Sequence, residues 1–299
     1  MTWRQFERRQ QAIEKEFIPK MEHAIRLEIT KATEHFKVHG NGSILYSSVG
    51  IMTTLKELYH KAVHSEASIQ YKKLKTVKLV GLGTNEAWNK VVETYLMQHN
   101  VFNTVEHINE TTKKRVLQLI SDGIQEGKSV DQIVAIIEAD DIPLKRARLI
   151  VRTESVGAMN MGSMMGAIST GIMYQKKWVT AGDHRVRGMM PTDAFSHVSL
   201  NGELIDMEKP FNNGERIMFP GDKKGTSAGN FCNCRCCMSY VAKRDANGRI
   251  MRYPEIVPDK PGMSVGPDGK LSDLLFQIIM SQIFGNLVQD LIDNYANTN

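Results

Sequence analysis

The first 170 residues carry hydrophobic side chains at helical spacing. In residues 7–35 they recur every four positions, at Ile13, Phe17, Met21, Ile25 and Ile29. This spacing puts them on one face and the charged residues on the other, which predicts an amphipathic helix. Similar patterns predict helices over residues 51–75, 85–99 and 104–127, with a turn at residues 39–43 after the first helix.

Two signals mark the helices that follow. Ser129 is a predicted N-cap of a short helix whose apolar face carries isoleucines at positions 133, 136 and 137. Pro143 stands where a helix can begin, and that helix is expected to continue to about residue 170 through a methionine-rich stretch. Methionines at helical spacing are typical of an adaptable core.

The pattern changes at Gly171. Residues 172–180 alternate and are rich in strand-forming side chains, and residues 235–241 are predicted to form a last short strand. Asn201-Gly202 lies between apolar flanks in residues 197–205, which predicts a β-hairpin. Residues 171–243 are therefore expected to form a small, mainly antiparallel unit.

The end of the chain differs from the rest. Residues 244–270 are rich in proline and glycine and are predicted to be a linker, whereas residues 271–299 are predicted to form an acidic amphipathic helix. Such a helix has to pack on its own domain or on a partner. We expect an α+β fold with a helical region over 1–142, an α+β module over 143–243, the linker and the C-terminal helix.

Composition adds little to this interpretation. Hydrophobic residues make up 41% and charged residues 24% of the chain, as in ordinary globular proteins. Residues 271–289 are interrupted by Asp273 and several amides, so we expect no membrane insertion, and the charged first residues do not resemble a signal peptide. We therefore expect reduced or metal-bound thiols in a cytoplasm. The net charge of +5 permits contact with nucleic acid without requiring it.

All cysteines of the chain lie within six positions, at Cys232, Cys234, Cys236 and Cys237. A disulfide framework would spread its cysteines to close loops, so this clustering argues against one. Thiolates and imidazoles are the usual ligands of zinc. In an extended segment two alternating cysteines can reach one ion, whereas the first and third would lie about 13 Å apart. All three could bind only if the chain turned at Asn233.

We predict a zinc site built from Cys234, Cys236 and His197. The fourth ligand is expected to be one of three residues: Cys232, Asp183 or His184. Cys237 would face the other way as a buried apolar residue. Because the spacing lacks paired CxxC knuckles, a metal-free strand with reduced thiols and hydrogen-bonded histidines is the alternative.

Other charged residues form a second candidate group. Arg185 and Arg187 alternate in a segment predicted to be extended, so both would point the same way and could meet Glu154 or a phosphate. The predicted polar cluster is Arg152, Glu154, Asp183, Arg185 and Arg187, with a buried ion pair as the favoured interpretation. A basic run offers candidate contacts to DNA phosphates, the alternative being a solvated helix end: Lys72, Lys73, Lys75 and Lys78.

An ordered set of motifs over about 90 residues resembles one family. The set begins with Arg152-Thr153-Glu154, continues with a Lys-Trp strand that leads to Asp183-His-Arg-Val-Arg187, and includes His197 before a glycine turn. It closes with Asn233-Cys-Arg-Cys236. This order resembles the phage Mu F-like minor head proteins, also called phage head morphogenesis proteins. Where that family often has His-Pro before Asn-Cys-Arg-Cys, this chain has Phe231-Cys232, so Cys232 would replace the histidine or the site would be altered.

The resemblance implies a minor capsid protein without enzymatic activity. Such a protein is made in the host cytoplasm and lies inside the virion near the portal vertex, where it acts in head assembly and in DNA packaging or delivery. Its implied partners are the portal protein, other capsid proteins and, non-specifically, packaged DNA. The C-terminal helix is our candidate for docking on the portal.

Two other functions are considered. Mu F-like domains also resemble ADP-ribosyltransferase toxins in strand layout, and in such an enzyme Arg152 would hold a dinucleotide phosphate and Glu154 would be a weak candidate acid. No Gln/Glu-x-Glu motif accompanies them. A zinc-dependent DNA-binding module would need a dense basic face, whereas only Arg235, Lys223 and Lys224 lie near the cysteines in sequence.

Overall fold

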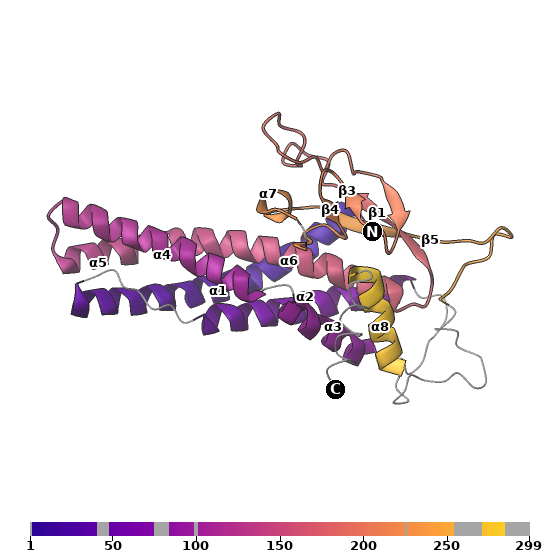
Figure 1. The fold of residues 1–299 in the computed structure, drawn as a ribbon, viewed down its shortest axis with the longest axis horizontal. Helices are drawn as coiled ribbons and strands as arrows, with labels where there is room; N and C mark the ends of the chain where they lie inside the picture. The colour runs from indigo at the N-terminus through magenta and orange to yellow at the C-terminus, as the bar shows by residue number, and fades with distance from the viewer. Residues whose placement is uncertain are drawn as a thin grey trace, which may run out of the picture.

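The computed structural model describes residues 2–40, 48–74, 84–98, 101–224, 226–253 and 271–284. Long helices form an elongated body, and short strands lie over one end of it (Figure 1). The α+β fold that the sequence predicted is confirmed. The helices of the body are α1 (Trp3–His39), α2 (Val49–Leu74), α3 (Thr84–Gln98), α4 (Val101–Gln125), α5 (Val130–Ala139) and α6 (Ile142–Ile168).

Local sequence sets the ends of these helices. Thr2 and Gln5 form a capping box at the start of α1, and Gly40 ends that helix with a left-handed φ of 63°. Ser129 caps α5 as predicted, again with a capping box, in which Gln132 is the partner. These local hydrogen bonds explain why the predicted helix boundaries lie within a few residues of the observed ones.

Helix α6 is the central element of the body, and it packs on both α1 and α2. Its methionines at positions 159, 161, 164 and 165 are buried in this core. Two glycines of α6 let its backbone approach α2 closely: a Cβ atom added at Gly162 or Gly166 would lie less than 3.0 Å from the carbonyl oxygen of Val63 or Ala67, respectively. The two helices therefore meet backbone to backbone, with no room for a larger residue.

A three-stranded antiparallel sheet has β1 (Tyr174–Val179) at its centre. β2 (Leu204–Asp206) lies on one side of β1 and β5 (Cys237–Ala242) on the other, with Lys176 opposite both Ile205 and Tyr240. A separate two-stranded ribbon joins β3 (Phe211–Asn212) to β4 (Arg216–Ile217). The short helix α7 (Ala228–Phe231) precedes β5.

The hairpin predicted around Asn201-Gly202 is wrong. Residues 198–202 form turns, and β2 pairs with β1, which ends at residue 179, rather than with a strand directly before the glycine. The Ser196 hydroxyl accepts from the Ser199 amide at 3.1 Å, and the Ser199 hydroxyl donates to the Ser196 carbonyl at 3.1 Å. These local bonds hold the segment in a turn and give its backbone an alternative to strand pairing.

The C-terminal helix α8 (Leu271–Phe284) packs on α3 and α6 of its own chain. Its buried residues are Leu275, Ile279, Met280 and Ile283. The predicted linker begins with ordered contacts, because β-bridges join Arg244 to Ile250 and Ile172 to Arg252. The remainder of the predicted linker and the predicted end of the helix, residues 254–270 and 285–299, lie outside the described residues. Among the residues described, no helix is both long enough and apolar enough to cross a membrane.

The start of α1 is attached to the sheet region. The indole Nε1 of Trp3 donates to the carbonyl oxygen of Arg235 at 2.8 Å, and the Arg235 guanidinium lies 5.0 Å from the centre of the Trp3 ring. Arg235 also forms ion pairs with Glu7, at 3.1 Å, and with Asp183, at 2.9 Å. One arginine beside the cysteines therefore connects the first helix to the loop that follows β1.

Candidate metal centre

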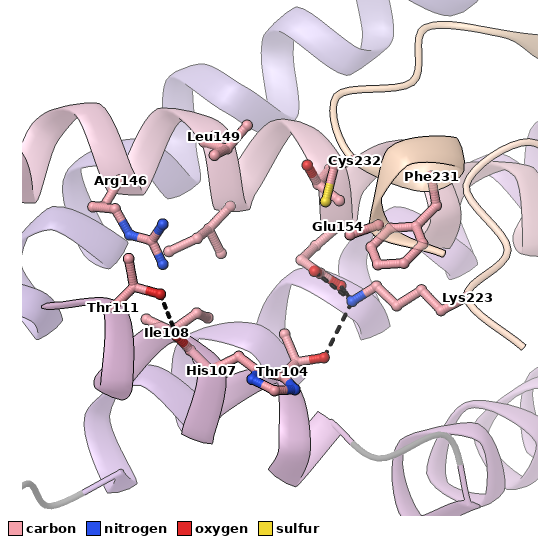
Figure 2. A pocket seen from close by; sticks show the side chains of 13 residues that line it. Thr104, His107, Ile108, Thr111, Arg146, Leu149, Glu154, Lys223, Phe231 and Cys232 are labelled. Atoms are coloured by element: carbon pink, nitrogen blue, oxygen red, sulfur yellow. Dashed lines mark hydrogen bonds and ion pairs between the residues drawn. The ribbon is translucent and has the colours of Figure 1, made fainter. Parts of the chain in front are cut away.

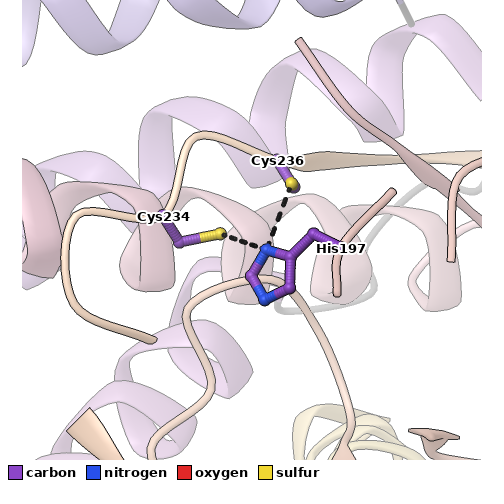
Figure 3. A group of neighbouring side chains, drawn as sticks. All are labelled: His197, Cys234 and Cys236. Atoms are coloured by element: carbon purple, nitrogen blue, oxygen red, sulfur yellow. Dashed lines mark hydrogen bonds between the residues drawn. The ribbon is translucent and has the colours of Figure 1, made fainter. Parts of the chain in front are cut away.

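Three side chains, from the loop after β1 and from the segment before β5, converge and form what we call the Cys–His cluster: His197, Cys234 and Cys236 (Figure 3). All three are buried, with at most 2% of each exposed. The Nδ1 atom of His197 lies 3.7 Å from the sulfur of Cys234 and 3.6 Å from that of Cys236. Their potential ligand atoms all lie within 4.8 Å of one another.

A sharp change of chain direction creates this arrangement. Asn233 adopts a left-handed φ of 57°, the only positive φ at a non-glycine residue in the described part of the chain. Its amide donates to the Thr153 hydroxyl of α6 at 3.0 Å, which fixes the turn on the helical body. Beyond the turn the chain is extended, so Cys234 and Cys236 present their sulfurs on the same side. Cys237, the next residue, is fully buried and lies outside the cluster.

The hydrogen bonds of His197 define its tautomer. Its Nε2 lies 2.7 Å from the Oδ1 of Asn230. The Nδ2 group of Asn230 donates to Asn213 and Glu215, which leaves Oδ1 as the acceptor that faces the imidazole. Nε2 therefore carries the proton, and the lone pair of Nδ1 points at the two sulfurs. Histidines that ligate metals are commonly oriented in this way, by a carbonyl oxygen on the nitrogen that does not bind the metal.

The electrostatics of the cluster favour one thiolate. The hydrogen bond from Cys236 lowers the pKa of Cys234 well below the ordinary value, and His197 lowers it further. Burial raises the pKa of Cys236 well above that value, and the neighbouring Cys234 adds to the rise. Burial opposes the charged form of His197, but the bond and charge of Cys234 raise its pKa overall. The thiolate is the form of cysteine that binds metal ions.

The spacing of the donors fits zinc. Zn–S and Zn–N bonds of about 2.3 and 2.0 Å at a tetrahedral angle place a sulfur and a nitrogen ligand about 3.5 Å apart. The two observed S···N separations agree with this value. The buried indole Nε1 of Trp178 has no hydrogen-bond partner among the described residues, and its polarity favours the thiolate form of Cys236. The cluster supplies three donors and could hold a metal ion whose fourth position is filled from elsewhere.

None of the three residues predicted for the fourth position joins the cluster. Cys232 lies before the turn at Asn233. Its side chain is half-buried and lines a pocket between α4 and α6. Asp183 is held by Arg185 at 2.7 Å and by Arg235 at 2.9 Å, and His184 is exposed. The turn thus brings Cys234 and Cys236 to His197 while it separates Cys232 from them.

The residues of the predicted polar cluster lie in separate places. Arg152 pairs with Glu14 of α1 at 3.0 Å. Residues 183–187 form a turn rather than an extended segment, so neither Arg185 nor Arg187 approaches Glu154: Arg185 pairs with Asp183, and Arg187 donates to the carbonyl oxygen of Cys232. The prediction that the two arginines point the same way is wrong. The Asp183 carboxylate accepts from the Arg185 amide, and this hydrogen bond stabilises a turn in place of an extended segment.

Glu154 has partners that the sequence analysis did not identify. The Nζ of Lys223 lies 2.5 and 2.6 Å from its two oxygens (Figure 2). The Tyr59 hydroxyl also donates to Glu154, at 2.9 Å. Glu154 is 4% exposed, so this is a buried ion pair, as favoured from the sequence, although with a lysine instead of an arginine. No sequence spacing could indicate these partners, since Tyr59 lies 95 positions and Lys223 69 positions away.

The lysines proposed to contact DNA are only partly described. Lys72 and Lys73 are exposed in the last turn of α2. Lys75 and Lys78 lie outside the described residues.

The structure defines an α+β protein in which a small sheet rests on a helical body and a buried Cys–His cluster lies against Trp178 of β1. Residues 114–239 match the family model described as Phage Mu protein F like protein. Over this part of the chain, the match agrees with the family resemblance that the motifs indicated. The matched segment contains α5, α6, β1 to β4, the first half of β5 and all three members of the Cys–His cluster. Comparisons with curated proteins and with solved structures found no match.

Proposed function

We propose that this protein is a minor head protein of a tailed bacteriophage that acts in head assembly and in DNA packaging or delivery from a position near the portal. The observation that carries the proposal is the match of residues 114–239 to the Phage Mu F-like family. This segment contains most of the sheet and all of the Cys–His cluster, so the similarity extends to the part of the chain with the most distinctive chemistry.

The surroundings of Arg152 and Glu154 support a structural role for both. Arg152 joins α6 to α1 through Glu14, and Glu154 joins α6 to Lys223 and to Tyr59 of α2. An ADP-ribosyltransferase would need the arginine to bind a dinucleotide and the glutamate to act in catalysis. In this structure the charges of both residues are satisfied by the protein itself, and no observation favours the enzyme hypothesis.

We further propose that the Cys–His cluster binds zinc through Nδ1 of His197 and the sulfurs of Cys234 and Cys236. Bound zinc would supply a fixed crosslink between the loop after β1 and the segment that leads into β5. Because this segment also carries Arg235, which holds the start of α1, such a crosslink would stabilise the attachment of the sheet to the helical body.

The proposed partners follow from the surface and from the family. Lys72 and Lys73 are exposed and suit non-specific contact with DNA phosphates, which needs charge without base readout. The portal protein remains the proposed protein partner. The apolar side of α8 is buried on α3 and α6 of its own chain. Docking of α8 on the portal, as proposed from the sequence, would therefore have to use another face of the helix.

The experiment that tests the head-protein proposal uses the phage that encodes this chain. DNA-filled heads would be purified, their proteins identified by mass spectrometry, and chemical crosslinks to the portal mapped. We expect peptides of this chain in the heads, crosslinks to the portal, and failure to form infectious particles when its gene is deleted. Its absence from purified heads, together with normal particles after deletion, would show that the proposal is wrong.

A further inference from the structure

A cavity of about 400 Å³ lies between α4, α6 and α7, separate from the Cys–His cluster. Its volume falls within the range of small-molecule sites, about 300 to 1,000 Å³. Much of its wall is hydrophobic: Ile108 comes from α4, Leu149 and Ile150 from α6, and Phe231 from α7 (Figure 2). The head-protein proposal assigns no role to this cavity.

The charged groups of the cavity lie at its two ends. Arg146 and Glu154 are eight positions apart on α6, which corresponds to about 12 Å along the helix axis. Glu154 is neutralised by Lys223, which also donates to Thr104 at 3.3 Å. This end of the cavity is therefore electrically balanced.

The other end is not balanced. The guanidinium of Arg146 is directed into the pocket (Figure 2). Its Nε is buried and has no acceptor among the described residues. A buried donor without a partner destabilises the protein unless an ion or ligand supplies the acceptor. Two cations, Arg146 and Lys223, face one carboxylate, Glu154, so the lining carries one uncompensated positive charge.

We propose that this cavity binds a small organic carboxylate with an apolar body. The carboxylate would accept from Arg146, whose planar fork suits a carboxylate, and the apolar part would lie along Ile108, Ile150 and Phe231. A single negative charge matches the one uncompensated cation. A dianion would leave a buried charge without a partner.

The first test measures binding of hexanoate by saturation-transfer NMR, with 1-hexanol as the uncharged probe. Arg146→Met keeps an unbranched side chain but removes the donor, and Arg148→Met changes an exposed arginine on the same helix that does not line the cavity. We expect hexanoate to bind the native protein and the Arg148 variant equally. Loss of the charged hydrogen bond should weaken binding to the Arg146 variant by about tenfold or more. Equal affinity for hexanol, equal affinity in both variants, or no hexanoate binding at all would overturn the proposal.

A second measurement uses the native protein alone. Cys232 lines the cavity and is half-buried, whereas the other three cysteines are buried. Hexanoate should slow alkylation of Cys232 by iodoacetamide, followed by peptide mass spectrometry, and 1-hexanol at the same concentration should not. An unchanged rate at a hexanoate concentration that saturates the NMR signal would show that the carboxylate binds elsewhere.

Discussion

The close approach of α6 to α2 leads to a prediction with a definite sign. We consider Gly162→Ala, which adds one methyl group at the contact with Val63. In an isolated helix this substitution is stabilising by about 1 kcal/mol, because alanine has a higher helix propensity than glycine. The packing of the two helices should reverse that effect.

The size of the reversal follows from the contact that the methyl group would make. The added Cβ would lie less than 3.0 Å from the carbonyl oxygen of Val63 and less than 3.0 Å from its Cα. Both are backbone atoms, so a rotamer change cannot relieve the overlap and the helices have to move apart. Overpacking of this kind costs roughly 1–3 kcal/mol, and a backbone clash belongs at the upper end. The net loss of unfolding free energy should be about 2 kcal/mol.

Gly50→Ala provides the matched control. Gly50 lies in α2, where an added Cβ would meet only Ala24, at an ordinary distance of 3.6 Å from its Cβ. This variant should gain up to about 1 kcal/mol. Urea unfolding followed by circular dichroism measures both variants against the native protein. If Gly162→Ala proved as stable as the native protein, the backbone contact between α2 and α6 would not be the reason for a glycine at position 162.

Three further predictions concern the metal centre and two ionisable groups. We expect elemental analysis to find about one zinc ion per native chain. Cys234→Ser should lose this zinc and have a lower melting temperature, whereas Cys237→Ser should keep its zinc. Equal zinc in both variants would contradict the proposed ligands. Burial lowers the pKa of Lys176 from 10.5 to about 7, so between these pH values the unfolded state binds more protons and the free energy of unfolding should rise with pH. Lys176→Met should remove this rise, measured as the change in urea midpoint between pH 7 and pH 9. The same change in the variant would show that Lys176 does not cause it. Hydrogen bonds from Arg185 and Arg235 hold the pKa of Asp183 well below its ordinary value, so this carboxylate stabilises the fold above its unfolded pKa and the stabilisation is lost as the pH falls. The stability lost in Asp183→Asn, measured by urea unfolding, should be largest near pH 6 and shrink towards pH 2. A loss that does not depend on pH would exclude the ion pairs as its origin.

Features that depend on neighbouring residues could be predicted from the sequence. The helices and their caps follow from apolar spacing and from local hydrogen bonds such as that of Ser129. The pairing of Cys234 and Cys236 with His197 was predicted from the alternation of an extended chain and from the chemistry of the side chains, and the structure brings these three together. The position of Cys232 was left open, because it depended on the conformation of a single residue, Asn233.

Features that depend on distant residues were not predictable in the same way. The Lys223 partner of Glu154 is brought near by the arrangement of three helices and a loop, which no local pattern encodes. The alternation of Arg185 and Arg187 was interpreted as an extended segment, but the Asp183 carboxylate accepts from the Arg185 amide and the backbone forms a turn. The glycine at position 202 was correctly associated with a turn, while the pairing of β2 with β1 depends on register across a long loop.

The contact between Trp3 and Arg235 has a consequence for how the protein folds. The two residues are 232 positions apart, so the start of α1 cannot reach its final site until almost the whole sheet region has been synthesised. At about 5 to 20 residues per second, this delay on the ribosome is roughly 10 to 50 s. Meanwhile α1 and α2 can already cover each other's apolar faces, because their contacts need only the first part of the chain. Docking of Trp3 would then be a late event that marks completion of the fold rather than its beginning.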